Sequence, residues 1–470
     1  MSRFSRPIGL VLAGMLVVIL LQAEEAKPTL VPEDPDVVML RRIHNTALSG
    51  SPAYAQLREL TENFPGRLSG SKNLEAAVAW ARSILEKTGA DRLELQSVMV
   101  PHWERGAPES VRIIGPVGTR SQAELLSATA LGGSVPTPAG DLRAAVVELL
   151  ALDALKTTDV KGKIVFFNRP MRAQEITPGA AYGGAGDQRN QGPAEAAKYG
   201  AVGVLTRSLT QALDDIPHTG NTTYLPDVPR IPAAALSTLA ADRLSTALRA
   251  DPTLQVELAI HSQWLDDASS HNVVAEITGS EFPDKIILIG AHLDSWDIAP
   301  GAHDDGAGVV QAIETLRLFR AIGYHPRHTI RCVLFVNEEN GLRGALEYAR
   351  LATEKREEHL LAFETDGGGF QPRAFQLGNT AGNAAARAAR WQTLFEPYGR
   401  LDIRNGKGGA DVMPLLAKGY AVGELVNESQ RYFDIHHTRA DTIDQVNPRE
   451  LQLGAAALAS FAFLVDQHGL

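Results

Sequence analysis

Two continuous apolar runs in the second half of the chain most constrain what it can fold into. They cover residues 286–289 and 330–336. Continuous rather than alternating apolar residues are typical of strands inside a parallel sheet that is covered on both faces. Between the runs, Val309, Ile313 and Leu316 recur at the i, i+4, i+7 spacing of a helix packed along one side. A strand, a helix and a second strand in this order predict an α/β fold.

Two adjacent glutamates, Glu338 and Glu339, come directly after the second apolar run. Open α/β sheets bind their ligands at the carboxyl ends of their strands. Like charges disfavour each other's ionisation, so a purely structural protein has no reason to crowd two of them there. A metal centre gives a reason, because one glutamate binds the cation while its neighbour handles the proton of a metal-bound water. Glutamate pairs are also common as solvated surface charge, so the surrounding segments decide between the two interpretations.

Four further segments place histidines or carboxylates just past a strand or in a loop. They are residues 291–297, 302–308, 364–369 and 436–442. Nitrogen and oxygen ligands without thiolate suit zinc, and by chemistry alone also cobalt or manganese. Two cations that share one carboxylate, each with one imidazole and two carboxylates, require two histidines and three acids. The five segments together supply that number.

With these segments the chain resembles the M28 family of co-catalytic zinc peptidases, and within it the carboxypeptidase Q (plasma glutamate carboxypeptidase) branch. Residues 292–308 carry the most specific part of the resemblance, which also includes Gly66-Arg67-Leu68 and spans most of the mature chain. It implies a three-layer α/β zinc-peptidase domain, with a mostly parallel mixed sheet covered by helices, over residues 24–112 and 257–470. It also implies an inserted β-rich domain similar to a protease-associated (PA) domain over residues 113–256, which resembles such domains at 160–165 and 197–201.

The resemblance implies two Zn²⁺ per chain and a ligand set to hold them. His292 and Asp366 would bind one zinc, and Glu339 and a histidine near the C-terminus the other. Asp304 would bridge both ions, through an Asp304–Asp305 peptide bond that is expected to be cis. Of two adjacent histidines, the family's spacing H-x-x-x-D favours His437 as the ligand.

The resemblance also implies two residues that act on the ligands or on the substrate. Glu338 would be the general base, which takes a proton from a water that bridges the metals. Asp294 would orient the imidazole of His292 from outside the metal's coordination sphere. His436 stays open as the alternative to His437, because the two are neighbours in the sequence.

The expected activity is that of an exported dinuclear zinc exopeptidase that hydrolyses short peptides, of the dipeptidase or aminopeptidase type. A metallo-carboxypeptidase that acts on a free C-terminus fits the same centre. A single-zinc enzyme similar to glutaminyl cyclase, or a non-catalytic binding protein of this architecture, would be expected to lack part of the ligand set. Dimers in the branch imply a homodimer. A net charge of -10 makes nucleic acid an unfavourable partner.

The first 23 residues have the pattern of a signal peptide. Arg3 and Arg6 form a positive region, residues 8–21 are apolar, and Leu21-Gln22-Ala23 supplies a small-residue cleavage site. The apolar run is short for a membrane span, although an uncleaved anchor is the alternative. We therefore expect export to the periplasm or the medium, with no membrane attachment after cleavage.

A few other residues have two interpretations each. His303, before the Asp-Asp pair, is interpreted as a partly exposed histidine rather than a pocket residue. Trp296 fits either a pocket wall or the core, and Asp411 resembles a substrate-side loop of the family. The remaining histidines are interpreted as surface or hydrogen-bonded histidines: His102, His218, His261 and His271.

Overall fold

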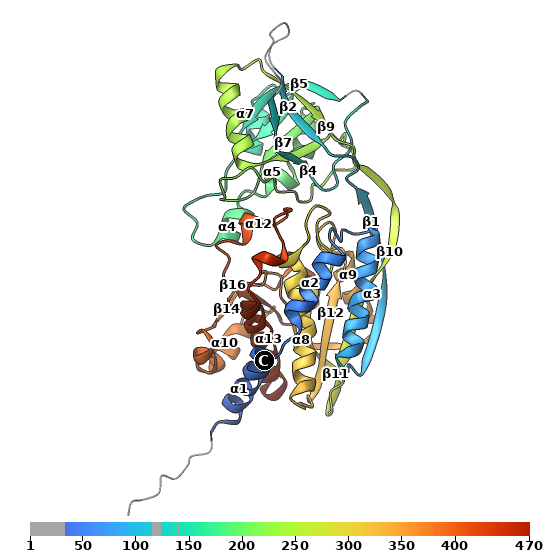
Figure 1. The fold of residues 1–470 in the computed structure, drawn as a ribbon, viewed down its shortest axis with the longest axis vertical. Helices are drawn as coiled ribbons and strands as arrows, with labels where there is room; N and C mark the ends of the chain where they lie inside the picture. Colours follow the sequence, from blue (N-terminus) through green and yellow to red (C-terminus); the bar gives the residue numbers. More distant parts are fainter. Residues whose placement is uncertain (1–32, 115–123, 140) are drawn as a thin grey trace, which may run out of the picture.

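The structure is a computed structural model, and it describes residues 33–114, 124–139 and 141–470. The segment interpreted as a signal peptide, residues 1–23, lies outside the described residues. Figure 1 shows two lobes, each built on its own mixed sheet of eight strands. The α/β prediction is confirmed. Among the described helices, none is long and apolar enough to cross a membrane.

The first sheet carries its parallel strands at its centre. Neighbouring strands β12, β11, β13 and β16 run parallel, and antiparallel pairings flank them on both sides. In spatial order the strands are β1 (Arg92–Glu104), β10 (Gln263–Ile277), β12 (His328–Phe335), β11 (Phe282–His292), β13 (Glu358–Glu364), β16 (Val422–Asn427), β14 (Pro372–Gly378) and β15 (Asp402–Asn405).

Helices cover both faces of this sheet, which explains why its central strands are apolar throughout. On β11, Ile287 and Ile289 pack into a core with helices on one face, while Ile286 and Leu288 pack into a second core on the other. The helices of the first core are α1 (Pro35–Leu48), α2 (Ala53–Asn63), α3 (Lys72–Lys87), α8 (Ala307–Ala321), α10 (Ala384–Ala388) and α13 (Pro448–His468). Those of the second are α9 (Arg343–Lys355) and α11 (Met413–Leu416).

The second sheet and its helices, residues 110–259 with the gaps given above, are called the insert lobe here. The domain boundaries expected from the sequence and the assignment of the insert as a PA-like domain both stay predictions. In spatial order its strands are β3 (Glu124–Leu126), β2 (Ser110–Ile114), β9 (Gln255–Ala259), β5 (Leu142–Leu149), β6 (Ile164–Phe167), β7 (Gly203–Arg207), β8 (Ala233–Leu236) and β4 (Ala128–Ala130). Its helices are α4 (Pro178–Gly183), α5 (Asp187–Asn190), α6 (Gly192–Lys198) and α7 (Thr238–Ala250).

Two long paired strands connect the lobes. The chain enters the insert lobe after β1 and returns through β10, and these strands pair antiparallel from Arg92 to Glu104 (Figure 1). Directly after β1, the guanidinium of Arg105 donates hydrogen bonds to both carboxylate oxygens of Asp297, at 2.6 and 2.7 Å. Trp296 packs so closely on Gly132 of the insert lobe that a Cβ there would lie 2.0 Å from the indole ring. The insert lobe is therefore held against the loop that follows β11.

Candidate metal centre

Three neighbouring parallel strands deliver the candidate ligands to one edge of the first sheet. β11 ends at His292, which lies opposite the last residue of β12, and Glu338 and Glu339 follow that strand after a short turn. β13 pairs with β11 up to Glu364, two residues before Asp366. Because the strands are parallel, their carboxyl ends meet at the same edge, where α/β sheets place their ligands.

His292 presents one ring nitrogen to two carboxylates. Its Nδ1 lies 3.0 Å from the main-chain oxygen of Asp294, so Nδ1 carries the proton and Nε2 has a free lone pair. That Nε2 is 3.3 Å from Oδ1 of Asp304 and 3.4 Å from Oδ1 of Asp366. Nε2 of His292 and Oδ1 of Asp366 are both buried, and within the described residues neither has a hydrogen-bond partner.

His437 makes the equivalent arrangement on the other side of Asp304. Its Nδ1 lies 3.3 Å from the main-chain oxygen of Thr219, which leaves the lone pair on Nε2. This Nε2 is 3.3 Å from Oδ2 of Asp304 and 3.1 Å from Oε2 of Glu339. Asp304 therefore directs one carboxylate oxygen to each histidine, and its peptide bond to Asp305 is cis, as expected.

The five side chains fit a divalent cation on chemical grounds. The possible ligand atoms of His292, Asp304 and Asp366 lie within 4.8 Å of one another, as do those of Asp304, His436 and His437, and Glu339 joins the second group through its contact with His437. Burial, with the negative charge of Asp304 added, raises the pKa of Glu339 to about 7. Burial likewise raises the pKa of Asp366. Cations placed among these groups would offset both effects, and nitrogen and oxygen ligands of this kind are the ones that zinc uses.

His436 also lies next to Asp304, but with fewer contacts. Its Nε2 is 3.4 Å from Oδ2 of Asp304, and its ring stacks on that of His437 with centroids 3.5 Å apart. Within the described part of the chain, neither of its ring nitrogens forms a hydrogen bond that would fix the ring, whereas His437 has both Thr219 and Glu339. That His437 rather than His436 is the ligand stays a prediction.

Asp294 binds the main chain of Glu338 and Glu339. Its carboxylate accepts hydrogen bonds from the main-chain N–H of Glu338 at 3.1 Å and of Glu339 at 3.2 Å. Nδ1 of His292 lies closer to the main-chain oxygen of Asp294, at 3.0 Å, than to the carboxylate of Asp294, at 3.8 Å. The side chain of Glu338 remains partly exposed and lines the cavity described below. Burial raises the pKa of its carboxyl well above the ordinary value.

Two buried charged residues that the sequence analysis did not place at the centre support it from behind. Asp441 accepts hydrogen bonds from the main-chain N–H groups of His303, at 2.7 Å, and of Asp304, at 3.0 Å. The guanidinium of Arg67 is fully buried and donates to main-chain oxygens of the two loops around the centre, among them that of Leu293 at 2.9 Å. Pro300 and Gly301 supply two others.

The prediction that His303 is partly exposed is wrong. Its side chain is fully buried, Nδ1 accepts a hydrogen bond from the main-chain N–H of Gly369 at 3.0 Å, and the ring stacks on Phe370. Burial lowers the pKa of His303 to about 4, so the ring is neutral. Trp296 is a core residue, with no exposed surface. Asp411 is buried as well, and burial raises the pKa of its carboxyl.

Both lobes line the cavity at the centre, which has a volume of about 340 Å³. The sequence analysis did not name the individual lining residues of the insert lobe, because no motif marks them and only the fold brings them to the centre. The lobe of the first sheet lines it with Asp304, Glu338, Glu339, Asp366, Tyr432, His436 and His437. The insert lobe lines it with Tyr182, Arg189, Asn190, Asn221 and Thr223.

Known proteins match the chain over most of its length. The pattern of Peptidase family M28 matches residues 272–462. Carboxypeptidase Q of Homo sapiens is 32% identical over 432 residues, which cover 90% of this chain and 88% of that protein. The crystal structure of a Peptidase M28 precursor from Shewanella amazonensis SB2B is 35% identical, with a TM-score of 0.86 and coverage of 92% and 96% of the two chains.

A more distant solved structure shares the fold. BSAP, a zinc aminopeptidase from Bacillus subtilis, superimposes with a TM-score of 0.62 at 20% identity, over 87% of this chain and 93% of the other. At that identity the likeness concerns the fold alone.

Proposed function

Because this chain belongs to peptidase family M28 and is a zinc metallopeptidase, we propose that it is an exported exopeptidase that cleaves short peptides with two zinc ions per chain. The observation that carries the proposal is the orientation of Asp304, whose two carboxylate oxygens lie 3.3 Å from the Nε2 atoms of two different histidines. A carboxylate in that position can bridge two cations. The signal-like segment supports export.

The proposed ligands form two sets with one shared member. His292 and Asp366 would hold one zinc, His437 and Glu339 the other, and Asp304 both. The hydrogen bonds from each Nδ1 to a main-chain oxygen support this, because they fix the tautomer in which Nε2 can bind a metal.

Glu338 is the proposed general base. Zinc bound at such a centre lowers the pKa of a bound water and polarises a carbonyl group. The carboxylate of Glu338 would accept the proton of the attacking water and pass it to the leaving amine. Asp294 would keep this carboxylate in place through its hydrogen bond to the Glu338 main chain. A partly exposed position in the cavity supports the role, since a base must reach the substrate.

The size of the cavity supports a short substrate. A volume of about 340 Å³ is at the small end for ligand sites, and residues of both lobes line the cavity. A dipeptide would fit such a space better than a long chain. The assignment of the insert lobe as a PA-like domain and the homodimer stay predictions.

The test uses the protein from residue 24 onward, loaded with zinc. We expect about two zinc ions per chain by elemental analysis, and hydrolysis of alanyl-alanine that stops when its N-terminus is acetylated. One zinc per chain would contradict the dinuclear proposal. Equal cleavage of the acetylated peptide would replace the dipeptidase or aminopeptidase assignment with that of a carboxypeptidase.

A further inference from the structure

A second cavity, called the side pocket here, adjoins the metal centre at the carboxyl end of β16. It has a volume of about 250 Å³. Asp366 and Tyr432 line both this pocket and the cavity at the centre, so a peptide whose carbonyl group lies at the metal ligands can extend a side chain into it. The lobe of the first sheet also lines the side pocket with Gln376, Glu424, Leu425, Val426, Asn427 and Phe433.

Apolar side chains and the insert lobe enclose the side pocket. Val426 and Phe433 line it, and the ring of Phe433 stacks on that of Tyr182 in α4, with centroids 4.6 Å apart. The insert lobe contributes Thr177 and Gly179, at the start of the same helix. A space of this size with apolar walls suits the aliphatic part of one long side chain.

Glu424 is a partly buried carboxylate in the lining of the side pocket. Within the described part of the chain, its side chain forms neither a hydrogen bond nor an ion pair. Burial, with the negative charge of Asp366 added, raises the pKa of its carboxyl to about 7. Glu364 and Asp411 are also buried acids with unpaired oxygens among the described residues, but neither lines the side pocket or the cavity at the centre. A buried charge without compensation costs free energy, and at Glu424 a bound cation could offset that cost.

Two amides of the side pocket offer hydrogen-bond acceptors rather than donors. Gln376 lies opposite Glu424 in the pairing of β14 with β16, and its amide nitrogen donates to the main-chain oxygen of Lys407 at 3.0 Å. The amide nitrogen of Asn427 donates to the main-chain oxygen of Gly368, and its buried Oδ1 has no partner among the described residues. Because both nitrogens are engaged, the two amides have their oxygens left to accept hydrogen bonds from a ligand such as an ammonium group.

Arg404 is a cation that also lines the side pocket, but it does not compensate Glu424. It lies opposite Gln376 in the pairing of β14 with β15, so two strand spacings, about 10 Å, separate its main chain from that of Glu424. Its side chain is exposed, and no ion pair joins the two residues. Solvent and salt screen a charge in such a position.

We propose that the side pocket binds the side chain of the N-terminal residue of a short peptide, and that Glu424 makes it selective for a cationic side chain such as that of lysine. The proposal rests on the proposed function and deepens it, because it names the residue that the exopeptidase prefers. The aliphatic stem of lysine would lie along Val426 and Phe433 while its ammonium group reaches the carboxylate. The C-terminal residue fits less well, because Glu424 would repel its free carboxylate.

The test compares lysyl-alanine with norleucyl-alanine, whose side chain has the same number of carbons as that of lysine but no ammonium group. For the zinc-loaded wild type, we expect kcat/KM to be higher for lysyl-alanine by about 10- to 100-fold, the range of a hydrogen bond to a charged group. Glu424→Gln should bring this ratio close to one. Glu428→Gln removes the same charge just beyond β16, where the carboxylate pairs with Arg373 outside the pocket lining, and it should leave the ratio unchanged.

Three outcomes would overturn the proposal. The first is equal cleavage of the two peptides by the wild type. The second is a Glu424→Gln variant that cleaves both peptides more slowly by the same factor, because Glu424 would then bind the α-amino group that both peptides share. The third is a preference for alanyl-lysine over alanyl-norleucine that Glu424→Gln abolishes, because the side pocket would then bind the C-terminal residue. A ratio measured within one protein does not depend on the fraction of that variant that folds.

Binding separates failure of this proposal from failure of the proposed function. Calorimetry with Glu338→Gln protein measures binding of lysyl-alanine and norleucyl-alanine without turnover. Tighter binding of lysyl-alanine, lost in the Glu338→Gln, Glu424→Gln double variant, supports the selectivity of the side pocket even if the wild type hydrolyses neither peptide. Equal binding of both peptides overturns that selectivity even if the wild type proves to be a peptidase.

Discussion

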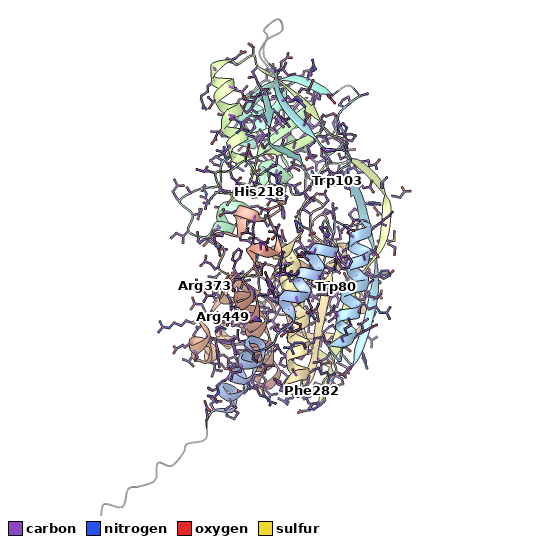
Figure 2. All side chains as sticks on the ribbon, viewed as in Figure 1. Trp80, Trp103, His218, Phe282, Arg373 and Arg449 are labelled. Atoms are coloured by element: carbon purple, nitrogen blue, oxygen red, sulfur yellow. The ribbon has the colours of Figure 1, made fainter. Side chains whose placement is uncertain are left out.

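Nδ1 of His218 lies 2.8 Å from the main-chain oxygen of His436, so a side chain of the insert lobe holds the segment that carries His437. The next residue, Thr219, donates its main-chain N–H to the oxygen of His437 at 3.1 Å and accepts from Nδ1 of that residue. Figure 2 shows His218 where the two lobes meet. The insert lobe thus orients a candidate ligand, in addition to lining the cavity.

His218→Leu should weaken zinc binding at one of the two sites. Loss of a group that orients a ligand from outside the coordination sphere typically costs about 10- to 100-fold in metal affinity. Competition with a chromogenic chelator measures it. His218→Asn, whose amide can donate from near the position of Nδ1, should recover most of the affinity, and His261→Leu changes an exposed histidine as a control. Wild-type affinity in His218→Leu would contradict the role.

Glu338→Gln should keep the metal and lose the activity. Glutamine preserves the shape of the side chain and the hydrogen bond from its main chain to Asp294, but it cannot accept the proton of the attacking water. We expect a fall in kcat of about a hundredfold or more, with the zinc content of the wild type. A variant with near-normal kcat would remove Glu338 from the role of general base.

His437→Ala and His436→Ala should differ in zinc content. His437 has a hydrogen bond that fixes its ring and a second carboxylate neighbour, Glu339, at 3.1 Å, whereas His436 has neither. We expect elemental analysis to find one zinc lost from His437→Ala and both retained in His436→Ala. The reverse result would make His436 the ligand.

Acid should destabilise the fold partly through His44, which is far from the centre in the sequence and lies in α1. Burial lowers the pKa of His44 to about 4 in the folded protein. The unfolded chain, with an ordinary pKa near 6.5, takes up the proton first, so stability is lost as the pH falls from about 6.5 to about 4. The loss is on the order of 3 kcal/mol for this residue.

The measurement is the free energy of unfolding in urea, followed across this pH range for the wild type and His44→Gln. Glutamine does not titrate, so the difference between the two proteins should shift in favour of the variant as the pH falls. A difference that stays constant between pH 6.5 and pH 4 would show that His44 does not contribute to the loss.

The sequence predicts those parts of the centre that depend on strands alone. His292 ends a buried strand, Glu338, Glu339 and Asp366 each follow one, and neighbouring parallel strands bring such residues to one edge. The residues it could not predict depend on contacts between segments far apart in the chain. Arg189 reaches the cavity only because the insert lobe docks on the loop after β11.

His303 shows the same limit in the catalytic lobe. A histidine in a loop next to two aspartates is expected to be partly exposed, since polar loop residues usually are. Its burial follows from Gly369 and Phe370, which come from the segment after β13 and close over it. Nothing local in the sequence around residue 303 carries that information.

The pairing of β1 with β10 has a consequence for the history of the chain. Because the two strands run side by side, the points where the insert lobe begins and ends lie next to each other in space. A module joined at two adjacent points can be acquired, lengthened or exchanged without changing the order of strands in the host sheet. The metal ligands on the host sheet could therefore be inherited unchanged. A different insert lobe, with different cavity-lining residues, would alter which peptides bind.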